Sequence, residues 1–205
     1  MTLVEVLIVI TALVIVVAVF IPRQAHPSTA SQINCMMNIK QIDFAFLMDA
    51  EDNSRRFTIQ TPVTNGGTME FLDRNQTFPH YQKLSKYLPD LLVFVCPADK
   101  TRHAADNYEH LTDNNLSYFL NADVSTNNPS KSIMVGDRHL QANGKPVGHG
   151  TFTVRTNMFL TWTAEMHRGN GILGFADGHT ETCRPYNLNL VIQSQAFAAT
   201  HLSIP

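Results

Sequence analysis

The hydrophobic pattern is most uneven at the start of the chain, where a long apolar run stands apart from the rest. Between Leu3 and Ile21 the only polar residues are Glu5 and Thr11, and Pro22 follows directly. At a rise of about 1.5 Å per residue, a helix over this run is about 28 Å long, close to the hydrocarbon thickness of a bilayer. The pattern therefore predicts a membrane-length helix that ends or kinks at Pro22.

The acidic residue inside this run needs an explanation, because an unpaired carboxylate in lipid is costly. A secretory signal peptide would have positive charge before its apolar core and small residues at a cleavage site after it, and this sequence shows neither. A plain membrane anchor leaves Glu5 without a partner. A third interpretation pairs Glu5 with the amino terminus of a neighbouring copy, which makes the helix an assembly element as well as an anchor.

A second helix is predicted after a short polar stretch, because Pro27 or Ser28 suits a first helical turn. Apolar residues then recur at helical spacing until Asp, Asn and Ser gather near Glu51–Asn53, where we expect the helix to end. The apolar stripe comprises Ile33, Met37, Phe44 and Met48, with Met36, Ile39 and Phe46 close by. We expect this stripe to pack in the core, with a ligand groove as the weaker alternative.

The remainder predicts short β segments between turns. The expected strands are Leu91–Cys96, Leu116–Asn121, Ser132–Arg138, Ile172–Ala176 and His179–Cys183. Asn143–Lys145 is a tight-turn signal, and Asp177-Gly178 suits a two-residue turn between the last two strands. A short helix is expected near Tyr81–Tyr87, while Asn187–Ala199 fits either a strand or a short helix.

Length and charge exclude some functions. The 205 residues favour one globular domain with an appendage. A net charge of −2 and no Lys/Arg cluster beyond Arg55-Arg56 argue against contact with nucleic acid. Cys35, Cys96 and Cys183 are too scattered for a zinc site built from short paired spacings. If the chain lies outside the cytoplasm, we expect two of the three cysteines to form a disulfide and the third to remain a thiol. The spacing does not say which two cysteines pair.

Candidate catalytic chemistry is sparse, so we expect no enzyme and no catalytic residue. The nine histidines form no HExxH array, and no serine or cysteine lies in a nucleophile motif. Cys96 has no positive neighbour or base in sequence that would activate it. His167 could approach Asp177 across a strand pair, which would be a structural hydrogen bond.

One polar segment has the start of a calcium-loop pattern, since oxygen-bearing side chains alternate there. The residues are Asn121, Asp123, Ser125 and Asn127. The glycine and the closing glutamate of an EF-hand are absent, so an ordinary polar turn is the alternative.

Three stretches carry a resemblance to a known family. The apolar run with Thr2, Glu5 and Pro22 resembles the mature amino terminus of type IV pilins and type II secretion pseudopilins. The segment from residue 34 to 57 is similar to the one after the membrane helix in a pilin-like group common in Planctomycetes and Verrucomicrobia. HRGNGILGFADGHTE resembles the carboxy-terminal signature of that group, in which a His is followed by nine residues and Asp-Gly; here these are His167, Asp177 and Gly178.

The resemblance implies an α+β pilin fold, in which a long amino-terminal helix packs on a small antiparallel sheet. Residues 1–22 would be the transmembrane and filament-core helix, 23–57 its amphipathic continuation, and 58–205 the β-rich head. It also implies that a prepilin peptidase removes a leader before Met1 and that the Met1 amine is methylated, although the family usually has Phe at this position. Because the helix packs on the sheet in that fold, it implies a Cys35–Cys96 disulfide, with Cys183 free or paired between subunits.

The function implied is that of a structural subunit that polymerises into a type IV pilus-like filament, with Met1, Glu5 and Pro22 at the assembly contacts. The alternative is a type II secretion pseudopilin; a membrane-anchored enzyme or binding domain is the third hypothesis. The expected partners are copies of the chain, the prepilin peptidase, the assembly machinery and the inner membrane. The expected location is the inner membrane before assembly, then an extracellular filament or a periplasmic pseudopilus. No cofactor is expected except calcium, which some pseudopilins hold.

Overall fold

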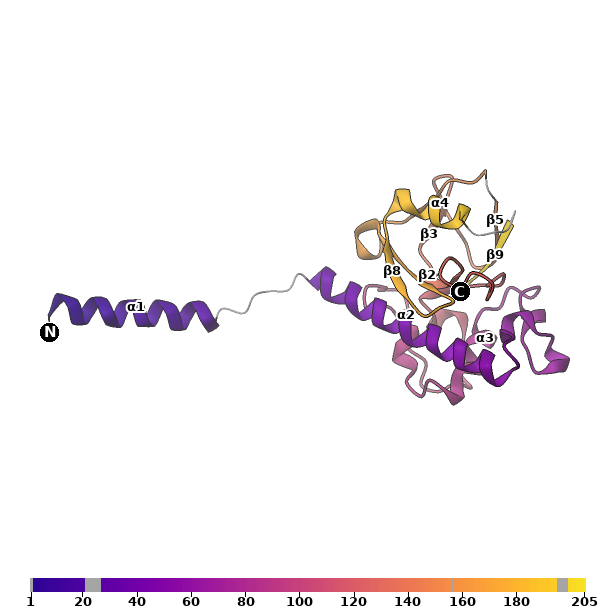
Figure 1. Cartoon of the computed structure of the whole chain (residues 1–205), viewed down its shortest axis with the longest axis horizontal. Coiled ribbons are helices and arrows are strands. Elements are labelled where there is room, and N and C mark those ends of the chain that lie inside the picture. The colour runs from indigo at the N-terminus through magenta and orange to yellow at the C-terminus, as the bar shows by residue number, and fades with distance from the viewer. Residues whose placement is uncertain (1, 21–26, 156, 195–198) are drawn as a thin grey trace.

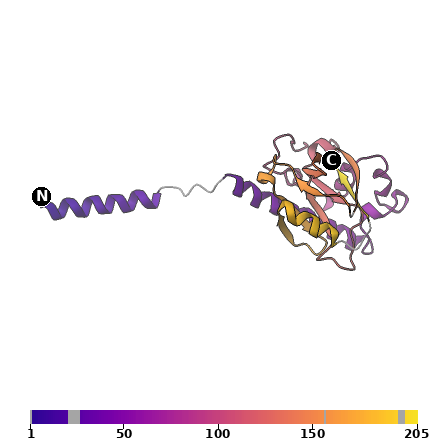
Figure 2. The same cartoon turned by 90° about the horizontal axis from the view of Figure 1, so that it is seen from above.

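The computed structural model describes residues 2–20, 27–155, 157–194 and 199–205 (Figure 1). Two helices, α1 (Leu3–Phe20) and α2 (Pro27–Asp52), come first in the chain. In both views α1 lies apart from the globular part, whereas α2 runs along it (Figures 1 and 2). The chain is thus mixed α+β, with amino-terminal helices and antiparallel sheets, as the sequence predicts at this level. Met1 and Pro22 lie outside the described residues, as does the segment where the continuity of the two helices would be decided.

The larger sheet has six strands in the order β5-β9-β1-β2-β7-β8, and its neighbouring strands are antiparallel. Its strands are β1 (Tyr118–Asn121), β2 (Ile133–Asp137), β5 (Gly150–Arg155), β7 (Gly171–Phe175), β8 (Thr180–Cys183) and β9 (Ala199–Ile204). A smaller sheet has the order β4-β3-β6, from β3 (Leu140–Ala142), β4 (Lys145–Pro146) and β6 (Leu160–Trp162). The β5–β9 and β1–β9 pairs place the end of the chain inside the larger sheet.

Short helices complete the globular part. Two are α-helical, α3 (Phe78–Gln82) and α4 (Pro185–Gln193). The single-turn 3₁₀ helices are η1 (Thr58–Gln60), η2 (Val63–Asn65), η3 (Met69–Phe71), η4 (Lys83–Lys86), η5 (Leu91–Phe94), η6 (Asp113–Asn115) and η7 (His167–Gly169).

Both faces of the larger sheet are covered. Tyr118 and Leu120 in β1 belong to the core that includes α2, whereas Phe119 between them belongs to a second core on the opposite face. The second core also contains Trp162 of β6 and Leu188 of α4. Because successive side chains of a strand point to opposite faces, a sheet covered on both faces needs apolar residues at nearly every position. This explains the continuous apolar runs of β1, β2 and β7.

Helix α2 begins at Pro27 and ends at Asp52, within the limits that the sequence predicts. It buries Ile39 and Phe46 of the predicted stripe, but not the four residues at the centre of that stripe. Ile33, Met37, Phe44 and Met48 are 48–56% exposed, while the buried residues are Cys35, Ile39, Ile42, Asp43, Ala45, Phe46, Asp49 and Ala50. At 100° per residue, these two sets lie on opposite sides of the helix. Because both sides are apolar, periodicity could not decide which one faces the sheet.

Several of the predicted β elements are confirmed. Strands β1, β2 and β8 lie within the predicted ranges, and β7 begins and ends one residue earlier than predicted. Asn143 and Gly144 both have positive φ values, 51° and 79°, in the tight turn between β3 and β4. Four residues instead of two separate β7 from β8, because β7 ends at Phe175 and β8 begins at Thr180; within this loop Gly178 takes the left-handed conformation, with φ 84°.

The predicted strand Leu91–Cys96 is wrong. Residues Leu91–Phe94 form the single-turn helix η5, and the Asp90 carboxylate accepts a hydrogen bond from the Leu92 N–H at its start. A short apolar run does not distinguish a strand from a buried helical turn, and the Asp90 cap decides for the turn. The segment Asn187–Ala199, for which the sequence allowed a strand or a short helix, contains the end of α4, at Gln193, and the start of β9, at Ala199. The helix predicted near Tyr81–Tyr87 is present as α3 followed by η4.

The predicted location is corrected by the structure. In the parts of the chain that the structure describes, none of the helices combines the length and the apolar character needed to cross a membrane. The expectation of an inner-membrane location before assembly is therefore wrong.

Helix α2 packs closely on strand β7 at Gly174. A Cβ added there would overlap the Asp43 carboxylate and would lie 2.6 Å from Ile39 Cγ2. We predict that Gly174→Ala lowers the free energy of unfolding by about 3 kcal/mol, because a close-packed interface cannot absorb the added methyl group without shifting. Urea unfolding followed by the fluorescence of Trp162, the only tryptophan, measures this change. The matched control is Gly148→Ala, where an added Cβ meets nothing within 4 Å; equal effects of the two substitutions would contradict the close approach.

Candidate functional site

The first candidate region is helix α1, whose described side chains, from residue 2 to 15, are all exposed. Ten of them are large and apolar, and their exposed fractions run from 40% at Val6 to 82% at Leu3. An apolar surface of this extent marks an interaction site. Because the helix is apolar on all sides, a single partner could not cover it.

Glu5 has a partner within its own helix. Its Oε2 accepts a hydrogen bond of 2.7 Å from the Thr2 N–H, and its own N–H donates to Thr2 Oγ1 at 3.4 Å. This reciprocal pair is a capping box, in which a Thr before the helix and a Glu three residues later satisfy each other's backbone donors. The signal, Thr-x-x-Glu before an apolar run, is present in the sequence but was not interpreted as a cap.

The second candidate region is a buried cluster of four side chains, which we call the Cys₂AspHis cluster: Cys35, Cys96, Asp137 and His167. Their exposed fractions are 0%, 0%, 1% and 7%. One ligand atom from each residue lies within 4.8 Å of all the others, so the cluster could bind a metal ion.

The four side chains come from four different elements. Cys35 lies on α2, Cys96 follows η5, Asp137 ends β2, and His167 begins η7. Cys35 Sγ lies 3.2 Å from Asp137 Oδ1, Cys96 Sγ lies 3.2 Å from His167 Nε2, and Asp137 Oδ2 lies 3.7 Å from His167 Nε2. The cluster therefore joins the long helix to the sheet and to two loops.

Neighbouring groups hold these side chains in place. The Tyr118 hydroxyl is 3.3 Å from Cys35 Sγ, and the Ile172 N–H donates to Asp137 Oδ2 at 2.8 Å. His167 itself has φ 47°, in the left-handed region that L residues with large side chains rarely adopt. Residues held in such sparsely populated conformations cluster at functional sites.

The charges in the cluster depend on one another. Burial raises the pKa of Asp137 to about 7, and the nearby Cys96 adds to the shift. The hydrogen bond with Cys35 lowers the pKa of Cys96 to about 5, and His167 contributes although burial acts in the opposite direction. Burial raises the pKa of Cys35 well above its ordinary value. Burial alone would lower the pKa of His167, but Cys96 and Asp137 outweigh it and raise that pKa.

The predicted disulfide is not present in the structure. Cys35 and Cys96 do come together, but both are free thiols, as is the buried Cys183. The argument from spacing against a metal site also fails. Short paired spacings are typical of sites built by one local motif, whereas the bonded pairs here are 102 and 71 positions apart in the chain.

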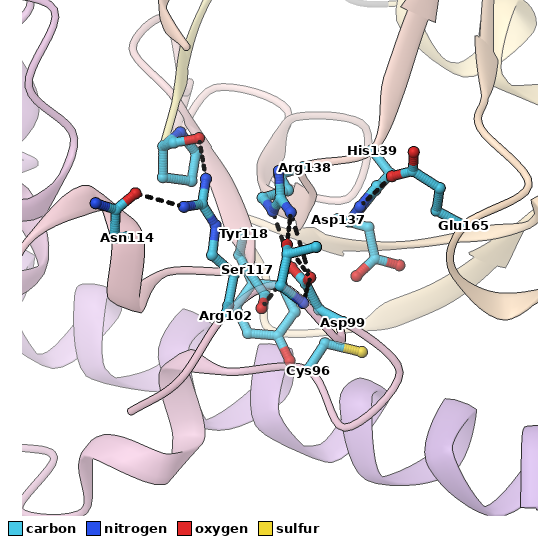
Figure 3. A network of polar contacts seen from close by, with 12 residues as sticks. Cys96, Asp99, Arg102, Asn114, Ser117, Tyr118, Asp137, Arg138, His139 and Glu165 are labelled. Atoms are coloured by element: carbon cyan, nitrogen blue, oxygen red, sulfur yellow. Dashed lines mark hydrogen bonds and ion pairs between the residues drawn. The ribbon is translucent and has the colours of Figure 1, made fainter. Parts of the chain in front are cut away.

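A buried ion pair connects the loop after Cys96 to the end of strand β2, and these two segments carry two of the four cluster residues (Figure 3). Asp99, in the loop that follows Cys96, accepts a hydrogen bond of 2.8 Å from Nε of Arg138, the residue after Asp137. Ser117 and Thr101 also donate to the Asp99 carboxylate. Burial would raise the pKa of Asp99, but these partners outweigh it and lower that pKa to about 2.

The other predicted site residues are used locally. Asp123 accepts two hydrogen bonds from His201, Asn121 bonds to the Ile133 carbonyl and the Asp123 N–H, and Ser125 accepts one from the Asn127 N–H. These contacts fit the polar turn that was the alternative to a calcium loop.

The expected approach of His167 to Asp177 is also not found. Asp177 bonds to His179 within the hairpin, while His167 contacts Cys96 and Asp137. The strand pairing puts the two ends of the His-x₉-Asp-Gly motif at different ends of β7, which explains the separation.

Comparison with known proteins adds no assignment: no family model, curated protein or solved structure matches this chain.

The ion pair beside the cluster gives a stability prediction. Arg138→Met leaves the buried Asp99 carboxylate without its cation, so we expect the free energy of unfolding to fall by about 2 to 3 kcal/mol; the hydroxyl partners of Asp99 limit the loss. Trp162 fluorescence in a urea titration again measures the change in the free energy of unfolding. Lys86→Met is the control, since it removes an ion pair whose side chains are 71% and 52% exposed and should cost less than about 1 kcal/mol. A loss at Arg138 no larger than at Lys86 would refute the bracing role.

Proposed function

We propose that this chain is a structural subunit, similar to a type IV pilin, that assembles with copies of itself into a filament through helix α1. The observation that carries the proposal is the exposure of every described side chain of an apolar helix. Its sequence is also the part of the chain that most resembles the assembly helix of pilins.

The energy of burial favours many neighbours. Full burial of a Val, Leu or Ile side chain contributes about 1.5 to 3 kcal/mol, and α1 has ten such exposed side chains. Association costs on the order of 4 to 15 kcal/mol in lost freedom and ordering. One neighbouring helix covers only one side of α1 and recovers a fraction of this energy, so a bundle of several helices is favoured over a dimer.

The second helix offers a continuation of the same surface. Ile33, Met37, Phe44 and Met48 lie on the side of α2 that faces away from the sheet, and about half of each side chain is exposed. In a bundle of α1 helices these residues would contact neighbouring subunits. A repeated heterologous contact of this kind gives an open helical polymer where successive rotations do not close into a ring.

Glu5 would then have two roles, as the acid of its own capping box and as the partner of a neighbour's amino terminus. The two roles respond differently to substitution. Gln at position 5 can still accept the capping hydrogen bond, because the capping box accepts Glu or Gln, but it has no charge for pairing between subunits.

We predict that Glu5→Gln strongly reduces filament formation, whereas Thr2→Ala, which weakens the cap by about 1 kcal/mol and keeps the acid, still assembles. The assay is electron microscopy and sedimentation of the purified full chain after detergent removal. Normal filaments from Glu5→Gln, with loss of filaments only in Glu5→Leu, would show that Glu5 acts through the cap alone.

Assembly of the chain without substitutions, in the same assay, tests the broader proposal of a pilin-like subunit. Long filaments support the pilin-like subunit, and only short assemblies would favour the alternative, a secretion pseudopilin. A chain that remains monomeric after detergent removal would overturn both.

A further inference from the structure

We propose that the Cys₂AspHis cluster is a zinc site that fastens helix α2 to the sheet and to the loops around it. The inference is independent of filament assembly, because it concerns the globular part of the chain.

The spacing of the four ligand atoms fits a tetrahedral ion. With zinc–sulfur bonds of about 2.3 Å and zinc–nitrogen or zinc–oxygen bonds of about 2.0 Å, the ligand atoms of a tetrahedral site lie about 3.3 to 3.8 Å apart. In the cluster, Cys96 Sγ lies 3.2 Å from His167 Nε2, while Asp137 lies 3.2 Å from Cys35 Sγ through Oδ1 and 3.7 Å from His167 Nε2 through Oδ2. Because all four ligand atoms are within 4.8 Å of one another, small side-chain shifts suffice to surround one ion.

The kinds of ligand select the metal. Two cysteine sulfurs and one imidazole are the donors that zinc prefers, whereas calcium and magnesium take oxygen ligands. Asp137 supplies the cluster's only carboxylate, so a hard cation would lack partners here. Four protein ligands leave no open coordination position, which is typical of a structural zinc site and not of a catalytic one.

Burial gives the reason for an ion at this place. All four residues are at least nine-tenths buried, and two sulfurs and a carboxylate point at one another. Thiolates and a carboxylate brought together away from water repel each other and lose their hydration. A divalent cation between them compensates both effects.

The surrounding groups fit the second shell of a metal site. The Tyr118 hydroxyl beside Cys35 and the Ile172 N–H on Asp137 would orient these two ligands. The left-handed backbone of His167 and Arg168, with φ 47° and 58°, aims the imidazole into the cluster. His167 also borders an open pocket of about 440 Å³, between the loop after Cys96 and η7, through which an ion could enter.

A Cys35–Cys96 disulfide is the competing state of the same residues. It would use both sulfur ligands, so one chain cannot hold the disulfide and the zinc ion together. The experiment must therefore measure both on the same sample.

The test is the metal content and thiol state of the full chain, produced with zinc and purified with reductant in a mild detergent. We expect one zinc per chain, two unmodified cysteines at positions 35 and 96 by mass mapping, and no displacement by excess calcium. Cys96→Ser and His167→Asn should each reduce bound zinc at least tenfold; Asn is chosen because it tolerates the left-handed backbone. Cys183→Ser is the matched control, since Cys183 is also buried but lies outside the cluster, and this variant should keep its zinc.

Substituting cobalt for zinc in the unmodified chain tests the ligands without relying on the folding of a variant. We expect a thiolate-to-cobalt charge-transfer band and the intense visible bands of a tetrahedral ion, and chelation should lower the midpoint of thermal unfolding by roughly 5 to 10 °C. No zinc in the reduced chain, zinc retained by Cys96→Ser, or an octahedral cobalt spectrum would each overturn the proposal.

Discussion

The contact between helix α2 and strand β7 at Gly174 is the constraint on which the rest of the structure depends. Because Gly174 has no Cβ, the helix comes close enough for Asp43 and Ile39 to lie directly over the strand. This contact sets the rotation of α2 about its axis. One apolar side, with Cys35 and Ile39, turns toward the sheet, and the opposite side, with Phe44, turns outward. The same rotation therefore brings Cys35 to Asp137 and leaves an apolar stripe for neighbours.

Buried acids in this protein are stabilised in different ways. Asp99 is ionised and paired with Arg138, which keeps its pKa low. Burial raises the pKa of Asp43 well above its ordinary value, and neither of its oxygens has a hydrogen-bond partner among the described residues. Burial therefore disfavours the charged form of Asp43, which packs against Gly174. Asp137 is intermediate between Asp99 and Asp43. Burial and Cys96 raise its pKa, while His167 acts in the opposite direction.

Much of the fold follows from local patterns. The ends of α2, strands β1 and β2, the β7–β8 hairpin and the turn at Asn143 and Gly144 all depend on residues close in sequence, and each was predicted. The errors have physical causes as well. The run from Leu91 became a helical turn because Asp90 caps it, and the two-sided apolar pattern of α2 does not say which side is buried.

The sequence by itself determined the apolar helix α1, its cap from Thr2 and Glu5, the ends of α2 and the positions of strands β1, β2, β7 and β8. These features depend on backbone hydrogen bonds and side-chain periodicity, which act over a few residues. Only the tertiary structure decided which face of α2 is buried, and with it the Cys₂AspHis cluster. The four residues of that cluster lie on separate elements with no common spacing, so they become neighbours only when the helix, the sheet and the two loops pack together.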